Sequence, residues 1–71
     1  MDIQIGLWLD NQDGGEQWIV SLDEIDGAGR VDVTDTLSVH PDYDTARQNA
    51  VSEGEDRGLE VVERRGSGLR N

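Results

Sequence analysis

The scarcity of large apolar side chains is the feature that most constrains how this chain can fold. Leu, Ile and Val together supply 17 of its 71 residues, and Phe is absent. That share lies only a little above the roughly 20% below which disorder becomes the rule. Cysteine is also absent, so no disulfide can reinforce so small a core. We expect one marginally stable domain over residues 1–65 and a flexible tail over 66–71, with a metal or a partner subunit as the remaining means of support.

The charge balance is strongly acidic. Sixteen Asp and Glu stand against six basic residues, all of them Arg, which gives a formal net charge of −10. In dilute buffer such a chain repels itself, whereas at 1 M salt the screening length falls to about 3 Å and like charges no longer interact over distance. The sequence therefore favours a protein that folds in concentrated salt.

This composition resembles that of haloarchaeal proteins: an excess of Asp, Arg in place of Lys, and few large apolar residues. No segment approaches the 18 apolar residues of a membrane span, and the N-terminus lacks the basic region of a signal peptide. We expect a cytoplasmic protein that is adapted to salt and does not contact a membrane.

Apolar and polar residues alternate in three segments, over residues 3–9, 18–22 and 31–39. A period of two is typical of strands, and the polar, glycine-containing segments between them predict turns. The third segment has one exception at its apolar positions, Asp35. Three strands with short connections predict an antiparallel meander.

The pattern changes at Pro41, which cannot lie inside a central strand. Residues 45–57 favour a helix, with Asp42 or Asp44 as its N-cap. Gly58 is the expected C-cap because glycine readily adopts the left-handed conformation there.

A stripe of small residues, Ala46, Ala50 and Gly54, recurs at every fourth position of this helix and predicts close packing on a sheet. Residues 59–63 predict a fourth strand. The fold class is therefore α+β: a four-stranded sheet in the order β-β-β-α-β, with one helix packed on one face. A right-handed crossover beside the first strand gives the spatial order 3-2-1-4.

The runs Tyr43–Arg47, at the start of the helix, and Gly58–Val62, after it, make residues 17–65 resemble a group of small uncharacterised haloarchaeal proteins. The resemblance implies the meander, the alanine-spaced helix and the glycine before the last strand. That group has no assigned activity, so no functional residues, cofactor or partner carry over from it.

The residue inventory excludes several classes of enzyme. Without Cys or Lys there is no thiolate nucleophile, no Schiff base and no P-loop lysine. His40 is the only histidine, and a Ser38-His40-Asp42 triad would require three side chains near a strand end to converge. A surface or capping role is commoner for such a histidine, so we expect a protein that is not an enzyme.

The acidic loop over residues 10–16 invites comparison with a calcium-binding EF-hand loop. Placing Gly14 at the sixth position puts Leu9 at the first and Val20 at the twelfth, where oxygen ligands are required. Placing Gly27 there puts Leu22 at the first position. We therefore expect solvated loops, and neither a metal site nor a cofactor.

One face of the predicted sheet remains uncovered by the single helix. If the alternating Ile and Leu residues of the first strand face the helix, Trp8, Ile19 and Val62 lie on the other face. A contiguous apolar patch on a small acidic protein indicates an interaction surface, although singly exposed apolar residues need no explanation. The sequence favours a small interaction module of unknown cellular role, which forms a two-fold homodimer through this face or binds a protein partner there.

A nucleic-acid-associated protein is the alternative. Four of the six Arg residues lie in the last fifteen positions: Arg57, Arg64, Arg65 and Arg70. Arginine binds phosphate, which makes Arg64 and Arg65 the candidate phosphate contacts. Glutamates are interleaved with them and no aromatic residue for base stacking lies beside them, so neutralisation of neighbouring acids is the simpler interpretation.

Overall fold

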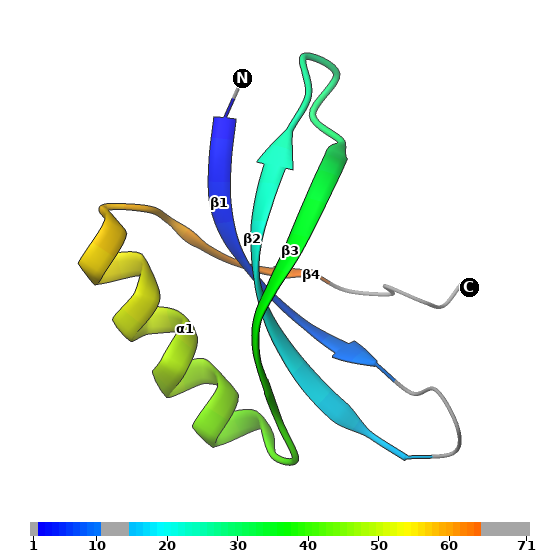
Figure 1. Ribbon diagram of the computed structural model, residues 1–71, viewed down its shortest axis with the longest axis vertical. Coiled ribbons are helices and arrows are strands. Elements are labelled where there is room, and N and C mark those ends of the chain that lie inside the picture. Colours follow the sequence, from blue (N-terminus) through cyan, green and yellow to red (C-terminus); the bar gives the residue numbers. More distant parts are fainter. Residues whose placement is uncertain (1, 11–14, 65–71) are drawn as a thin grey trace.

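The computed structural model of the protein describes residues 2–10 and 15–64. These residues form four strands and one helix: β1 (Asp2–Asp10), β2 (Gln17–Ile25), β3 (Val31–His40), α1 (Tyr43–Arg57) and β4 (Val61–Arg64). The sheet has the order β3-β2-β1-β4 (Figure 1). β1 and β3 pair antiparallel with β2, and β4 pairs parallel with β1. The predicted fold class and strand order are both confirmed.

The core lies between the sheet and α1, which covers one face (Figure 1). Ile5, Leu7 and Val20 are fully buried, and so are Ala46 and Ala50 on the helix. Because alanine has almost no side chain, the helix backbone approaches the sheet closely, as the small-residue stripe predicted. Half-buried side chains surround this core: Trp18, Leu22, Leu37, Tyr43, Leu59 and Val61.

Both ends of α1 have the expected caps. Asp42 is the N-cap, with an extended backbone and a carboxylate that accepts the Thr45 backbone N–H at 2.9 Å. This hydrogen bond from the backbone lowers the pKa of Asp42, because it favours the ionised carboxylate. Gly58 is the C-cap at φ 71°, the left-handed region in which glycine is favoured.

Gly54 allows the end of α1 to lie directly on the segment that leads into β4. A Cβ atom at this position would lie 2.8 Å from the Leu59 carbonyl oxygen and 3.0 Å from Cγ2 of Val61. The Leu59 N–H donates to the Gly54 carbonyl at 2.8 Å. β4 begins at Val61 rather than at residue 59, because the Leu59 N–H is bound to the helix; the Glu60 carbonyl then accepts the Ile5 N–H of β1 at 2.9 Å.

The prediction that the apolar residues of β3 share one face is wrong. The pairing of β2 with β3 shifts between Val20 and Ser21 and again near Ile25. Each shift adds one residue to β3, and a one-residue shift moves the following side chains to the other face. Val39 therefore pairs with Ile19 on the face away from α1, whereas Leu37 packs against the core.

Candidate functional site

The face of the sheet opposite α1, called here the open face, holds the residues that sequence analysis selected for an interface. Strand register places its central residues: Gln4, Gly6, Trp8, Ile19, Ser21, Asp23, Thr34, Thr36, Val39, Val62 and Arg64. Trp8 and Val62 are half-buried, and Val39 is 46% exposed. The Ile19 side chain is only 5% exposed, so it is buried beneath the other side chains of this face.

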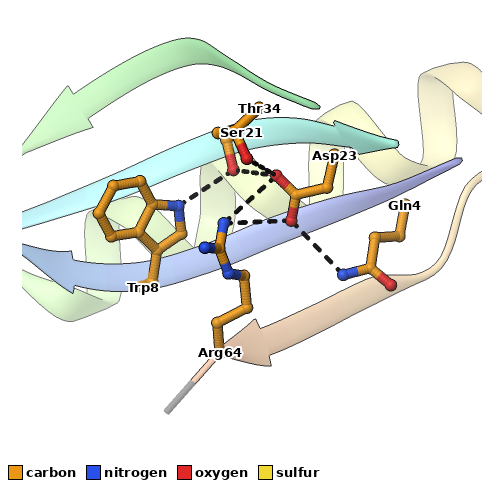
Figure 2. A network of polar contacts seen from close by, with 6 residues as sticks. All are labelled: Gln4, Trp8, Ser21, Asp23, Thr34 and Arg64. Carbon is orange, nitrogen blue, oxygen red and sulfur yellow. Dashed lines mark hydrogen bonds and ion pairs between the residues drawn. The ribbon is translucent and has the colours of Figure 1, made fainter. Parts of the chain in front are cut away.

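Asp23 lies at the centre of the open face and is nevertheless 0% exposed. Its carboxylate accepts hydrogen bonds from one side chain of every strand, which together form the polar cluster of Figure 2. The members are Gln4 of β1, Ser21 and Asp23 of β2, Thr34 of β3, Arg64 of β4, and Trp8, which reaches the carboxylate through Ser21. A buried carboxylate requires such partners, because burial of an unpaired charge is costly.

Gly6 provides the space that the carboxylate occupies. β1 lies between β2 and β4, so any side chain at this position would stand between Asp23 and Arg64. A Cβ atom on Gly6 would overlap Oδ2 of Asp23 and lie 2.8 Å from Oγ of Ser21. The glycine in the middle of this strand is therefore required by a close approach, not by a turn.

The hydrogen bonds to Asp23 differ in length. Ser21 Oγ donates to Oδ1 at 2.8 Å and Thr34 Oγ1 donates to the same oxygen at 3.2 Å. Nη1 of Arg64 lies 3.4 Å from both carboxylate oxygens, and Nε2 of Gln4 donates to Oδ2 at 3.4 Å. The shortest contact is thus local within β2, and the longer ones join the carboxylate to the other three strands.

Trp8 is held at two points. Its indole Nε1–H donates to Ser21 Oγ at 3.1 Å, and the Arg64 guanidinium lies over its ring at 4.9 Å from the centroid. A cation over an indole face is attracted by the ring quadrupole. The ring orientation is therefore set by groups that Asp23 itself holds.

The centre of the open face carries no net charge. Among its central residues only Asp23 and Arg64 are charged, and they pair with each other. The whole chain carries −10. The centre of the open face thus differs in net charge from the chain as a whole, and the acidic residues that β1 adds to this face, Asp2 and Asp10, lie at the two ends of the strand.

The candidate phosphate contacts are not both described. Arg64 lies on the open face, where its guanidinium pairs with Asp23, and its side chain is 24% exposed. Arg65, like the expected tail over 66–71, lies outside the described residues. No observation on the described residues adds to the nucleic-acid interpretation.

His40 and Ser38 lie close together: His40 Nε2 and Ser38 Oγ are 2.9 Å apart. The third member of the hypothetical triad has another role, because the Asp42 carboxylate caps α1 at Thr45. The charge of His40 acts on Asp42 only as a minor influence on its pKa. This geometry does not assemble a base-orienting triad.

On the covered side, Tyr43 connects the start of α1 to β4. Its hydroxyl donates to Glu63 Oε2 at 2.6 Å, and its ring meets Trp18 edge-on at 4.9 Å between centroids. The hydrogen bond to Glu63 raises the pKa of Tyr43, because only the protonated phenol can donate it, and the charge of Glu63 adds a smaller shift in the same direction.

Among residues 2–10 and 15–64, no group of three or more His, Asp or Glu side chains is placed to hold a metal ion. Of the predicted loop over 10–16, residues 11–14 lie outside this description. The single described helix is neither long nor apolar enough to cross a membrane. Comparisons of the chain with protein-family models, curated proteins and solved structures find no match.

Proposed function

We propose that this chain is a non-enzymatic interaction module that is adapted to high salt, acts in the cytoplasm and forms a homodimer through the open face. The observation that carries the proposal is the centre of that face, which has no net charge in a chain of net charge −10 because its two charged side chains pair with each other. The cores of protein–protein interfaces are depleted in charged residues, whereas most of this chain's surface is not.

A second copy is the partner that the charge distribution favours. Two copies with ten excess negative charges each repel one another over most of their surfaces. The centres of two open faces can meet without bringing a net like charge together, because Asp23 and Arg64 pair within each copy. In a two-fold dimer the same patch occurs on both subunits, so an internally neutralised patch is complementary to itself.

The apolar side chains of the open face support the same partner. In Figure 1 the four strands cross one another in projection and α1 lies to one side of them, so the open face is the side of the sheet that points away from α1. Trp8, Val39 and Val62 are the apolar side chains that this contact would cover.

Light scattering in about 2 M KCl, where charge repulsion is short-ranged, tests the proposal. We expect a mass near twice the 7.8 kDa of the chain. Val39→Asp adds one charge at an exposed position of the open face and should halve that mass, and Trp8→Asp should do the same. Val39→Asp is the more decisive variant because the Val39 side chain is already 46% exposed.

Gln48→Asp is the matched control, since it adds the same charge at an exposed position of α1. This variant should keep the mass of the parent protein. A parent protein that is folded and monomeric up to millimolar concentration would overturn the homodimer. Equal dissociation by Gln48→Asp and Val39→Asp would show that added charge, rather than the open face, controls association.

A further inference from the structure

We infer that Asp23 is a positioning residue of the open face: its carboxylate fixes the Trp8 ring and the Arg64 guanidinium in the arrangement that a second copy meets. This inference rests on the proposed homodimer. Trp and Arg are among the residue types most enriched where binding energy concentrates, and here they stack on each other. Neither of them needs to be ordered during association if Asp23 has ordered both beforehand.

Asp23 orients Trp8 through Ser21, and the donor and acceptor of each hydrogen bond between them are fixed by chemistry. An indole N–H can only donate and an ionised carboxylate can only accept, so the serine hydroxyl accepts from Trp8 and donates to Asp23. Ser21 is 0% exposed, so water does not compete for its hydroxyl. Removal of the carboxylate frees the hydroxyl to rotate, and the indole loses its fixed acceptor.

The control of Arg64 is direct. Nη1 contacts both oxygens of Asp23 at 3.4 Å, and this ion pair holds the guanidinium over the Trp8 ring. Arginine otherwise has many rotamers of similar energy, so its placement here depends on the buried acid. One carboxylate therefore orders two neighbouring side chains of the open face.

The same carboxylate makes the face compatible with a second copy. Without its charge, each subunit would bring an unpaired Arg64 cation to the patch that both subunits share. Loss of the Asp23 charge would thus weaken association in two ways, by disorder of Trp8 and by uncompensated charge at the contact.

Asp23→Asn is the test variant because it keeps the volume, removes the charge that holds Arg64, and replaces one of the two acceptor oxygens by an NH2 group that cannot accept. We expect the dimer dissociation constant, measured by sedimentation equilibrium in about 2 M KCl, to rise by about tenfold or more. Two ordered side chains are lost in each copy, which supports an effect of this size. We also expect the near-ultraviolet circular dichroism of Trp8 to diminish, recorded in a Trp18→Phe background so that Trp8 is the only tryptophan.

Gly29→Ala is the control for a merely structural effect. Gly29 has φ 83° in the β2–β3 turn and a Cβ atom there would meet nothing within 4 Å, so this substitution strains the backbone without contacting the polar cluster. It should leave the dissociation constant within about twofold and the Trp8 signal unchanged.

The outcomes separate the inference from the proposed function. A dimeric parent whose dissociation constant and Trp8 signal both survive Asp23→Asn would overturn the positioning role alone. Equal weakening by Asp23→Asn and Gly29→Ala would also overturn it, because general stability would then explain the loss. A monomeric parent would overturn the homodimer, and with it the inference that rests on it.

Discussion

Substitution of Gly6 by alanine is the sharpest perturbation that this fold offers. The added methyl group would occupy the position of the Asp23 carboxylate, which no longer fits between β2 and β4. Asp23 is fully buried and receives hydrogen bonds from all four strands, so it cannot move aside without breaking several of them. One methyl group therefore tests the whole polar cluster.

The expected cost follows from three contributions. Overpacking costs about 1–3 kcal/mol, and weakened hydrogen bonds to a charged group cost about 1.5–3 kcal/mol each if they are lost entirely. Replacement of glycine by alanine in a strand returns about 0.5–1 kcal/mol. Because the long contacts to Asp23 are the ones that break first, we expect a net loss of about 2 kcal/mol. For a domain of this size that corresponds to a fall in Tm of about 8–16 °C.

A double-mutant cycle with Asp23→Ala assigns the cost to its cause. Urea unfolding in about 2 M KCl gives the stability of the parent, both single variants and the double variant. Without the carboxylate the Ser21 hydroxyl is free to rotate away, so Gly6→Ala should cost less than about 0.5 kcal/mol in that background. The coupling should then be about 2 kcal/mol. Additive effects, within about 0.5 kcal/mol, would refute the reasoning.

Three further predictions concern single positions. Gly54→Ala should destabilise the fold despite a gain of about 0.8–1 kcal/mol in helix propensity, because the new Cβ would meet the backbone carbonyl of Leu59. A higher Tm in thermal unfolding would contradict this close approach. Gly29→Ala should lower stability by about 1 kcal/mol, whereas Gly27→Ala in the same turn, with open space and no positive φ, should change it by less than about 0.5 kcal/mol in urea unfolding. Tyr43 should dominate the alkaline behaviour, since the chain has no Lys or Cys and no other side chain titrates between about pH 9 and 12. The fold raises the pKa of Tyr43, so its contribution to the free energy of unfolding is complete below about pH 10 and is lost as the pH rises through the pKa of the folded state. The stability of Tyr43→Phe should show no such loss in unfolding curves.

Local signals in the sequence predict most of the architecture. Alternation gives the strands, Asp42 and Gly58 delimit the helix, and the single crossover rule gives the strand order. These features depend on residues close together in the chain or on general chirality. The register shifts in β3 carry no comparable signal, which is why the predicted face of Val39 is wrong.

The candidate site could be predicted only in part. Alternation places Trp8 on the open face, and the structure agrees. The polar cluster depends on Asp23 and Arg64, which are 41 positions apart and meet only through the register of β4 on β1. Gly6 was the available signal, since a glycine at the centre of a strand indicates that something approaches its backbone closely.

The late position of β4 in the chain has a consequence for how the protein folds. β1, β2 and β3 form from neighbouring hairpins, which close quickly because their loops are short. The partner of β1 on its other side is the last strand, and Ile5 pairs with Val61 across nearly the whole described chain. This pairing has a high contact order, so it is expected to form late.

During synthesis the edge of β1 that pairs with β4 therefore stays unpaired until β4 has left the ribosome. Such an edge is a template for pairing with other chains. In dilute buffer, repulsion between nascent chains that share the same acidic charge opposes such pairing, whereas in concentrated salt the repulsion acts only at short range. The net charge of −10 thus opposes association of incomplete copies most strongly at low salt.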